Sequence, residues 1–426
     1  MQKTQIVFRE FVPKEKERTY YERTFPVPEG VCRMDIEYDY RRYVETEEHG
    51  VVRKQERSII DLALRDGRGI YIGASGAGRK HIWISGWDSS DGYIRTDPDA
   101  GEWAIIVGAY KVAEEGVEIT YTVTFTHQER TLLKGETHIH TTASDGHLTA
   151  EHVVQMAKDA DLDYIFLTDH NGYAHNLALP VRSDITVLPG GEWTHYEGHA
   201  GMLGMQRPLE SAFCANSADE AWAKLAEARN NGALVVINHP FCPNTGWHFG
   251  IREGEFDLVE VINGGTTPQA NEQCIHWWHE QLCAGKKLPV IGGSDFHRMD
   301  PTKQIGQPAT AVWALSRSPR DILQALREGC GYLVLWSAAP VLWAEAEGSL
   351  LGGTARSGAE VHIRLEQLKG GDVIRLLTDQ GCEEILCEPH TAALHLTRVF
   401  PTAKFVRFEV LRWDRRVLLS NPIYFT

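Results

Sequence analysis

The sequence predicts an α/β protein in three parts, in which a closed or nearly closed barrel of strands and helices is flanked by two β-sandwich domains. Residues 1–133 show short apolar runs broken by turns, residues 134–338 alternate strand-like with helical runs, and residues 339–426 return to strand-like runs alone. A chain of 426 residues is long enough for about two or three domains. The hydrophobic content of 42% is typical of a globular protein with a sizeable core.

The N-terminal part has the pattern of an antiparallel sandwich. From Val117 to Phe125 apolar and polar residues alternate, which is the period-2 sign of a half-buried strand. Turn signals such as Asp66-Gly67 separate this run from several similar ones. We therefore expect a β-sandwich over residues 1–133.

In the middle part, segments with the pattern of strands alternate with segments that have the pattern of helices. Helices are predicted over residues 149–161, 217–230, 267–282 and 318–326, with Thr149 as an N-cap and with Ser217 and Glu220 forming a capping box. Counting the run near Gly135, about seven strand-like segments lie between and around these helices. Strands that alternate with helices predict a barrel over residues 134–338, and such barrels carry their chemistry at the C-terminal strand ends.

The last part no longer shows helical periodicity. In the run from Phe405 to Leu411, three apolar residues alternate with Arg407 and Glu409. We expect a small β-sandwich over residues 339–426.

Composition and charge restrict the class of protein. The formal net charge of -15 argues against broad binding to nucleic acid or to anionic membranes, although a local basic pocket remains compatible with it. No apolar run reaches about 18 residues, and the charged segment from Met1 to Arg23 does not resemble a signal peptide. The eight cysteines are scattered and are expected to be reduced, although Cys382 and Cys387 could bridge a hairpin. We predict a cytoplasmic protein and leave its oligomeric state open.

The stretch from Gly135 to Gly146, GETHIHTTASDG, contains the first candidate ligands. His138 and His140 are separated by one residue, so an extended backbone places both imidazoles on the same face, and Asp145 follows closely. Two hydrogen-bonded or surface histidines would give the same motif. Only further ligand-type residues at other strand ends can favour a metal site.

Such residues follow the other predicted strands. They are His170, Glu192, His199, His239, Asp295 and His297. A random scatter of 19 histidines would rarely place six of them, with three carboxylates, just beyond so many strands. Strand ends converge at one barrel rim, so we predict a metal cluster.

The ligand types indicate which metals fit. Imidazoles with carboxylates suit zinc, manganese or iron, and the lack of thiolates argues against a structural zinc site. Nine candidate ligands exceed the needs of one ion, and a carboxylate such as Glu192 can bridge two. Two or three ions can lower the pKa of a bridging water and stabilise a phosphoryl centre.

Four ordered motifs carry a family resemblance. They are H-I-H with Ser144-Asp145-Gly146, T-D-H-N at 168–171, N-H-P at 238–240 and G-S-D-F-H at 293–297. Together they resemble the polymerase and histidinol phosphatase (PHP) superfamily over Lys134 to Ser337. The flanking β regions and the segment from Ser420 to Tyr424 further resemble its carbaryl hydrolase branch (CehA/McbA type).

The resemblance implies a distorted (β/α)7 barrel that holds up to three divalent ions. The first ion would be held by His138, His140, Glu192 and Asp295. Glu192 would bridge to the second, which His199 and His239 also hold, and the third would take Asp145, His170 and His297. His195 lies in the same segment as His199 and is the alternative ligand there.

These residues predict a metal-dependent hydrolase, with phosphoester hydrolysis by a metal-bridging hydroxide and with Glu192 and Asp295 as the catalytic residues. One alternative is hydrolysis of carbamates, aryl esters or amides at the same site. Another is a carbohydrate- or protein-binding protein in which the sandwiches bind and the barrel is a scaffold.

Other residues near the motifs have candidate roles outside the metal-ligand set. We expect a small, anionic substrate, for which Arg252, His248 and Arg298 are candidate ligands, although each is otherwise an ordinary surface group. Asp169 either orients a ligand histidine or caps a turn. The other nearby histidines are expected to be solvated or to support ligands (His147, His152 and His175) or to be structural (His276 and His279).

Overall fold

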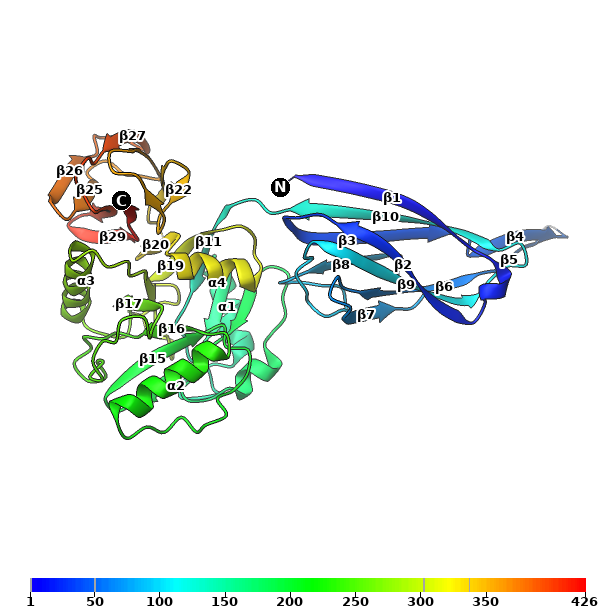
Figure 1. Cartoon of the computed structure of the whole chain (residues 1–426), viewed down its shortest axis with the longest axis horizontal. Coiled ribbons are helices and arrows are strands. Elements are labelled where there is room, and N and C mark those ends of the chain that lie inside the picture. Colours follow the sequence, from blue (N-terminus) through cyan, green and yellow to red (C-terminus); the bar gives the residue numbers. More distant parts are fainter. Residues whose placement is uncertain (1, 50, 302, 337) are drawn as a thin grey trace. The chain divides into compact units, whose positions relative to one another are not determined.

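The structure is a computed structural model that describes residues 2–49, 51–301, 303–336 and 338–426. The chain divides into two compact units, Met1–Arg130 and Thr131–Thr426. Figure 1 shows the first unit in blue and cyan, and the second in green through red.

The first unit is built from two antiparallel sheets of four strands. One has the order β1 (Lys3–Val12), β10 (Val117–His127), β3 (Val31–Tyr40) and β8 (His81–Ser85). The other has the order β2 (Thr19–Val27), β9 (Gly101–Lys111), β6 (Ile59–Arg65) and β7 (Tyr71–Ser75). The predicted alternation is confirmed in β10, where Ile119, Tyr121 and Val123 are buried. Both sheets contribute to one core.

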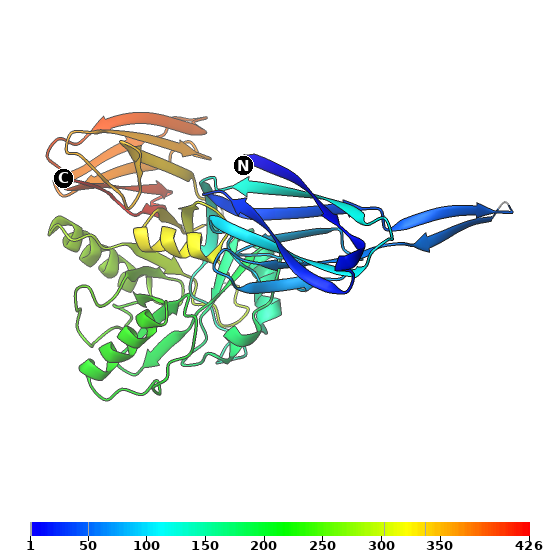
Figure 2. The same ribbon diagram turned by 45° about the vertical axis from the view of Figure 1, so that its right-hand side comes forward.

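A separate hairpin completes this unit. It consists of β4 (Tyr43–Glu48) and β5 (Val51–Glu56), which pair only with each other among the described strands. Figure 2 shows the hairpin projecting from one end of the two sheets.

The second unit contains four α-helices among its described residues. They are α1 (Ala150–Asp159), α2 (Ala218–Asn230), α3 (Pro268–Cys283) and α4 (Pro319–Glu328). In each helix the side chain of the residue before the first turn accepts a backbone amide, as Thr149 does for α1 and Ser217 for α2. The four predicted helices are therefore confirmed, and strands hold more of the described residues than helices do.

The strands of the predicted barrel fall into two sheets. The first has the order β13 (Thr186–Pro189), β12 (Tyr164–Leu167), β11 (Thr131–Glu136), β19 (Ala309–Ala314) and β20 (Gly331–Val334). The second has the order β14 (Glu192–His195), β15 (Gly198–Leu203), β16 (Leu234–Ile237), β17 (Leu258–Asn263) and β18 (Val290–Gly293).

These sheets mix parallel and antiparallel pairs. β11, β12 and β13 pair in parallel, as do β16, β17 and β18, which is typical of β/α units. β14 and β15 form an antiparallel hairpin, and β19 runs antiparallel to β11. Isolated bridges, Ile139 with Phe296 and His170 with Glu192, join the two sheets. Closure of a seven-stranded barrel by continuous ladders is not established and stays a prediction.

The C-terminal strands continue the first sheet. From β20 the order proceeds through β29 (Arg415–Ser420), β28 (Phe405–Arg412), β25 (Val373–Thr378) and β26 (Gly381–Leu386), and β28 also pairs with β30 (Ile423–Phe425), which pairs with β23 (Thr354–Ala355). A further sheet has the order β22 (Ser349–Leu350), β21 (Val341–Ala346), β24 (Glu360–Glu366) and β27 (Ala393–Val399). The predicted boundary near residue 338 stays a prediction, since residues 131–426 form one compact unit.

No helix in the described ranges combines the length and apolar character needed to cross a membrane. All eight cysteines are free thiols, so the hairpin disulfide left open for Cys382 and Cys387 is not formed.

Candidate metal centre

The two histidines of the first motif follow the C-terminal end of β11. Ile139 between them points into the core, while the rings of His138 and His140 are both buried with centroids 5.2 Å apart. The backbone here is held beside the segment after β18, because the amide of His140 donates to the carbonyl of Phe296 at 2.9 Å. The extended alternation therefore brings both imidazoles to one side, as the spacing predicts.

Glu192 is surrounded by imidazole nitrogens. Its Oε1 lies 3.2 Å from His138 Nε2, 3.2 Å from His199 Nδ1 and 3.4 Å from His239 Nε2. Its Oε2 lies 2.9 Å from His170 Nδ1 and 3.6 Å from His140 Nε2. The carboxylate is fully buried at the start of β14, so it can reach several ligand groups at once.

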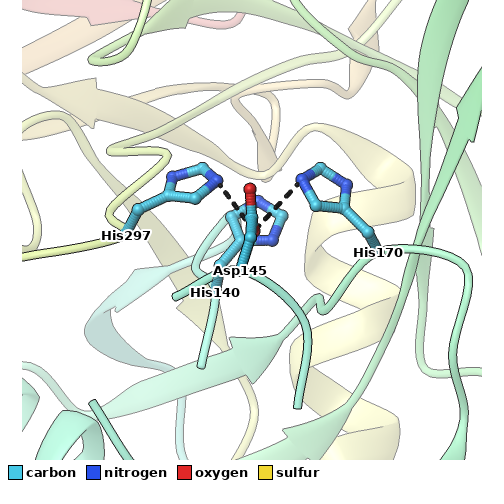
Figure 3. A group of neighbouring side chains, drawn as sticks. All are labelled: His140, Asp145, His170 and His297. Carbon is cyan, nitrogen blue, oxygen red and sulfur yellow. Dashed lines mark ion pairs between the residues drawn. The ribbon is translucent and has the colours of Figure 1, made fainter. Parts of the chain in front are cut away.

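Asp295 and Asp145 extend the cluster. Asp295 follows β18, and its Oδ1 lies 3.4 Å from His138 Nε2 and 3.2 Å from His140 Nε2. The Oδ1 of Asp145 lies 3.5 Å from His170 Nε2 and 3.4 Å from His297 Nε2. Figure 3 shows the rings of His170 and His297 on either side of Asp145.

All nine predicted ligand side chains are thus brought together. Eight of them have donor atoms that form three overlapping groups, namely His140, Asp145, His170 and His297; His138, His140 and Asp295; and His138, Glu192 and His239. His199 is outside these groups and joins the cluster through Glu192. Within each group the donor atoms lie within 4.8 Å of one another. The allocation of ligands to individual ions stays a prediction.

The structure favours His199 over His195 as the neighbour of Glu192. His199 lies on β15 and faces Oε1, whereas the Nε2–H of His195 donates to the carbonyl of Ala215 at 3.1 Å. The ring of His195 also stacks on Trp193 with an interplanar angle of 5°. His195 therefore supports the adjacent loop.

Unpaired buried atoms show that this cluster fits a cation. Nε2 of His138, both ring nitrogens of His140 and Nδ1 of His239 have no hydrogen-bond partner, although all are buried. Leaving such an atom unpaired costs about 1–3 kcal/mol. A divalent cation would satisfy imidazole lone pairs and neighbouring carboxylates together, and the mixed nitrogen and oxygen donors suit zinc, manganese or iron.

Electrostatics keep the carboxylates ionised. Burial by itself would raise the pKa of Glu192, but the charge of His138 and hydrogen bonds from imidazoles hold that pKa well below its usual range. The same competition lowers the pKa of Asp295. Burial lowers the pKa of His140, whereas in His138 the effect of burial is outweighed by Glu260 and Glu192, which raise its pKa well above the ordinary value. The centre therefore offers fixed negative charge to a cation.

Glu260 on β17 is a functional residue that the sequence reasoning missed. It is 1% exposed, and its Oε1 lies 2.9 Å from His138 Nδ1. Its Oε2 accepts the backbone N–H of His239 at 3.1 Å and the side-chain amide of Asn263 at 2.9 Å. One carboxylate thereby orients two predicted ligands. The available signal was a single Glu inside the apolar run L-V-E-V-I, because a buried charge requires partners.

Glu136 at the end of β11 was missed as well. Its Oε1 accepts the backbone amides of Thr137, His138 and Ser294 at 3.0–3.1 Å, and its Oε2 accepts that of Gly306 at 2.8 Å. Burial raises its pKa despite these hydrogen bonds. Glu136 fixes the H-x-H segment against the segment that carries Asp295.

Of the two roles left open for Asp169, its hydrogen bonds match the capping of a turn. Its carboxylate accepts the amide of Thr141 at 2.8 Å and the hydroxyls of Thr141 and Ser144 at 2.8 and 2.7 Å. Asp169 thus shapes the turn that presents Asp145. The turn also needs Gly146, since a Cβ there would lie 2.5 Å from the carbonyl oxygen of His140.

The three predicted substrate ligands are placed differently. Arg298 lines a cleft of about 400 Å³ together with Asp145 and His297, so it lies beside the metal centre. His248 is exposed in the loop after β16. Arg252 forms an ion pair with Asp219 on α2, and its guanidinium lies 5.8 Å from the Trp222 ring centroid.

The structure also shows the surroundings of the other histidines that were considered near the motifs and on the third predicted helix. His147 lines the same cleft as Arg298, and His175 Nε2 donates to the carbonyl of Gly190 at 3.0 Å. His152 is exposed at the start of α1. On α3, His276 lies 3.3 Å from Glu280, and Arg407 donates to Nδ1 of His279 at 3.4 Å.

Comparison with known proteins gives matches only among solved structures. No family model and no curated protein matches the chain. A two-domain protein from Bacteroides vulgatus, described as containing a predicted PHP-like metal-dependent phosphoesterase, is 21% identical over 69% of this chain and 96% of its own, with a TM-score of 0.40. A protein from Bifidobacterium adolescentis named as a metal-dependent phosphoesterase is 16% identical over 42% of this chain and 93% of its own, with a TM-score of 0.30.

An amidohydrolase from Chromobacterium violaceum, with bound sulfate and no metal, is 17% identical over 40% of this chain and 93% of its own, with a TM-score of 0.26. All three TM-scores are low. The case for a metal centre in this chain therefore rests on the side-chain geometry described above.

Proposed function

We propose that the chain is a metal-dependent hydrolase that acts on phosphoester bonds. The observation that carries this proposal is the buried carboxylate of Glu192, whose two oxygens lie within 3.6 Å of five imidazoles. Unpaired ring nitrogens surround it. Such a centre fits more than one divalent cation, as catalysis of phosphoryl transfer often requires.

Divalent ions bound here would lower the pKa of water and stabilise the charge that develops on phosphoryl oxygens. The protein side chains would position the cations and bind the substrate. Glu192 and Asp295 would help to hold the cations, and Glu260 would keep the ring of His138 in place. Arg298 in the adjacent cleft offers a guanidinium to an anionic substrate.

We extend the proposal to the finer predictions made from the sequence. The metals would be two or three zinc, manganese or iron ions. The chain would belong to the PHP superfamily and its carbaryl hydrolase branch, with a (β/α)7 barrel, and would act on a small anionic substrate in the cytoplasm.

Metal analysis and a turnover assay test this function. We expect bound divalent metal, hydrolysis of p-nitrophenyl phosphate that manganese or zinc increases, and loss of that activity with a chelator. Absence of metal together with no turnover of any ester would exclude the function. Turnover that a chelator abolishes would count against the alternative in which the chain only binds carbohydrate or protein.

Glu192→Gln should lower kcat on the order of 100-fold or more, because the amide keeps the shape and loses the charge that holds the cations. Glu197→Gln, at an exposed position in the same hairpin, is the matched control and should keep its activity. Thermal melting of both variants checks that they fold. Full turnover by a folded Glu192→Gln protein would contradict the role of this carboxylate.

A second candidate is hydrolysis of carbamates, aryl esters or amides. It is favoured by a cleft of about 810 Å³ beside His199, which has no Asp, Glu, Lys or Arg among its described lining residues and so suits a neutral substrate. Comparing turnover of 1-naphthyl methylcarbamate with that of p-nitrophenyl phosphate decides between the two. A large excess of kcat/KM for the carbamate would favour the second candidate.

A further inference from the structure

The cleft beside His199 combines amide and aromatic side chains with open space. Its volume of about 810 Å³ lies within the range of cavities that bind drug-sized molecules. The lining includes Tyr196, Phe213, Asn216 and Asn244, and none of the described residues that line it is Asp, Glu, Lys or Arg. Its surface therefore suits an uncharged group that offers a flat face and hydrogen-bonding atoms.

The inner wall of this cleft is part of the metal centre. His199, which lines it, lies 3.2 Å from Glu192 Oε1. Thr194 also lines it, and its Oγ1 lies 2.5 Å from Nδ1 of His170. A molecule in the cleft would thus contact the same side chains that face the cations.

Two aromatic rings at the cleft are exposed. Tyr196, at the turn between β14 and β15, is 94% exposed, and Phe213 is 45% exposed. Single exposed rings are common on protein surfaces, but two rings that line one cleft next to a buried charged centre indicate a binding surface.

The loop that carries Phe213 is anchored to β14. The indole N–H of Trp193 donates to the carbonyl of Phe213 at 2.6 Å. The Nε2–H of His195 donates to the carbonyl of Ala215 at 3.1 Å. The wall of the cleft is therefore formed before a ligand binds, which lowers the entropic cost of binding.

A second cleft, of about 400 Å³, has the opposite character. It is lined by Asp145, Asp295 and His297 of the metal centre and by the charged side chains of Arg298, Asp300 and Lys303. The two clefts are thus lined by different predicted ligands of the same centre, the charged one by Asp145, Asp295 and His297 and the other by His199. A substrate that spans the centre would place its uncharged group on the side of His199.

We propose that the cleft beside His199 binds the leaving group of the ester, and that this group is uncharged and carries an aromatic ring. This inference rests on the proposed phosphoesterase function. In that reaction the bond between phosphorus and the leaving-group oxygen breaks, and a water oxygen bonds to phosphorus. One proton of the water goes to the leaving oxygen, so a neutral alcohol or phenol forms inside an uncharged cleft.

Binding of two phosphonates by the full chain supplied with manganese tests the proposal without turnover. Phenylphosphonate and methylphosphonate share the same anionic group, and their carbon–phosphorus bond is not hydrolysed. We expect calorimetry to show phenylphosphonate binding on the order of tenfold more tightly, because its ring stacks on Tyr196 and Phe213. The double variant Tyr196→Ala with Phe213→Ala should remove this preference.

Tyr20→Ala is the matched control, since Tyr20 is also an exposed tyrosine, in the first unit, and it should keep the preference. Equal affinity for the two phosphonates, binding of neither, or a preference that survives the double variant would overturn the proposal. Tighter binding of phenylphosphonate than of methylphosphonate, without turnover of any phosphoester, would count against the proposed function alone. Turnover of a phosphoester with equal affinity for the two phosphonates would count only against the proposal that the cleft beside His199 binds the leaving group.

Discussion

Glu260 illustrates how a carboxylate that is not a predicted ligand organises the metal centre. It contacts Nδ1 of His138, so the Nε2 of that ring is left facing Glu192 and Asp295. It also accepts the backbone amide of His239, which fixes the start of the loop that carries this second histidine. Outer carboxylates of this kind fix the tautomer of a ligand histidine and increase its basicity.

Glu260→Gln should weaken metal binding by about 10- to 100-fold, because the amide retains the shape but loses the charge that favours His138 as a ligand. The measurement is competition for zinc with a chromophoric chelator, accompanied by thermal melting to confirm that the variant folds. Glu280→Gln, at an exposed position on α3, is the control. Unchanged zinc affinity in a folded Glu260→Gln protein would contradict the role assigned to Glu260.

At the residue scale, the sequence reveals those site residues that stand at strand ends. Six histidines and three carboxylates could be selected in this way because a strand end is visible as the end of an apolar run. Glu260 was missed because it lies within such a run. Glu136 stands at the end of β11, but the amides of Ser294 and Gly306 that it accepts belong to distant segments, so its role is not visible in the sequence. Arg252 was selected because it lies in the loop after His239, but its partner in space is Asp219 of α2.

At the element scale, helices were easier to predict than strand pairing. Side-chain caps such as Thr149 and Ser217 mark where a helix begins, and the structure confirms these starts. Strands of four residues such as β12 and β16 are buried throughout, so no alternation tells which strand pairs with which or in what direction. The antiparallel hairpin of β14 and β15, which presents both Glu192 and His199, was not predicted from the sequence either.

Asn421 connects two sheets of the second unit. It is buried directly after β29; its Oδ1 accepts the amide of Val290 at 2.8 Å, and its Nδ2 donates to the carbonyls of Val290 and Gly331 at 3.0 and 3.3 Å. Val290 begins β18 and Gly331 begins β20. One side chain therefore ties the second sheet to the first.

Asn421→Ala should lower the free energy of unfolding by about 3 kcal/mol, because it leaves a buried amide and two buried carbonyls with fewer partners. Chemical denaturation followed by circular dichroism measures the change. Asn230→Ala, at the exposed end of α2, should change the value by much less. A loss of under about 1 kcal/mol at Asn421 would mean that water replaces these hydrogen bonds.

At the scale of the whole molecule, the second unit shares one core across the predicted boundary at residue 338. Ile139 and Val153 belong to the same buried cluster as Leu342 and Phe408. In another cluster Trp278 of α3 belongs with Phe405, Leu419 and Tyr424 of the C-terminal strands. The change from mixed to purely strand-like patterns near residue 338 is real in the sequence, but patterns within a segment do not reveal which distant segment covers its apolar face.

This shared core predicts how fragments behave. A fragment of residues 131–426 should fold and keep its metal, whereas residues 131–338 should not, because removing β29 leaves the edge of β20 unpaired and exposes apolar side chains around Trp278. Residues 1–130 should melt cooperatively alone, since both of their sheets enclose one core. Circular dichroism melting and metal analysis of the three fragments test this. Cooperative melting with bound metal in the fragment 131–338 would instead make the C-terminal strands a separate domain.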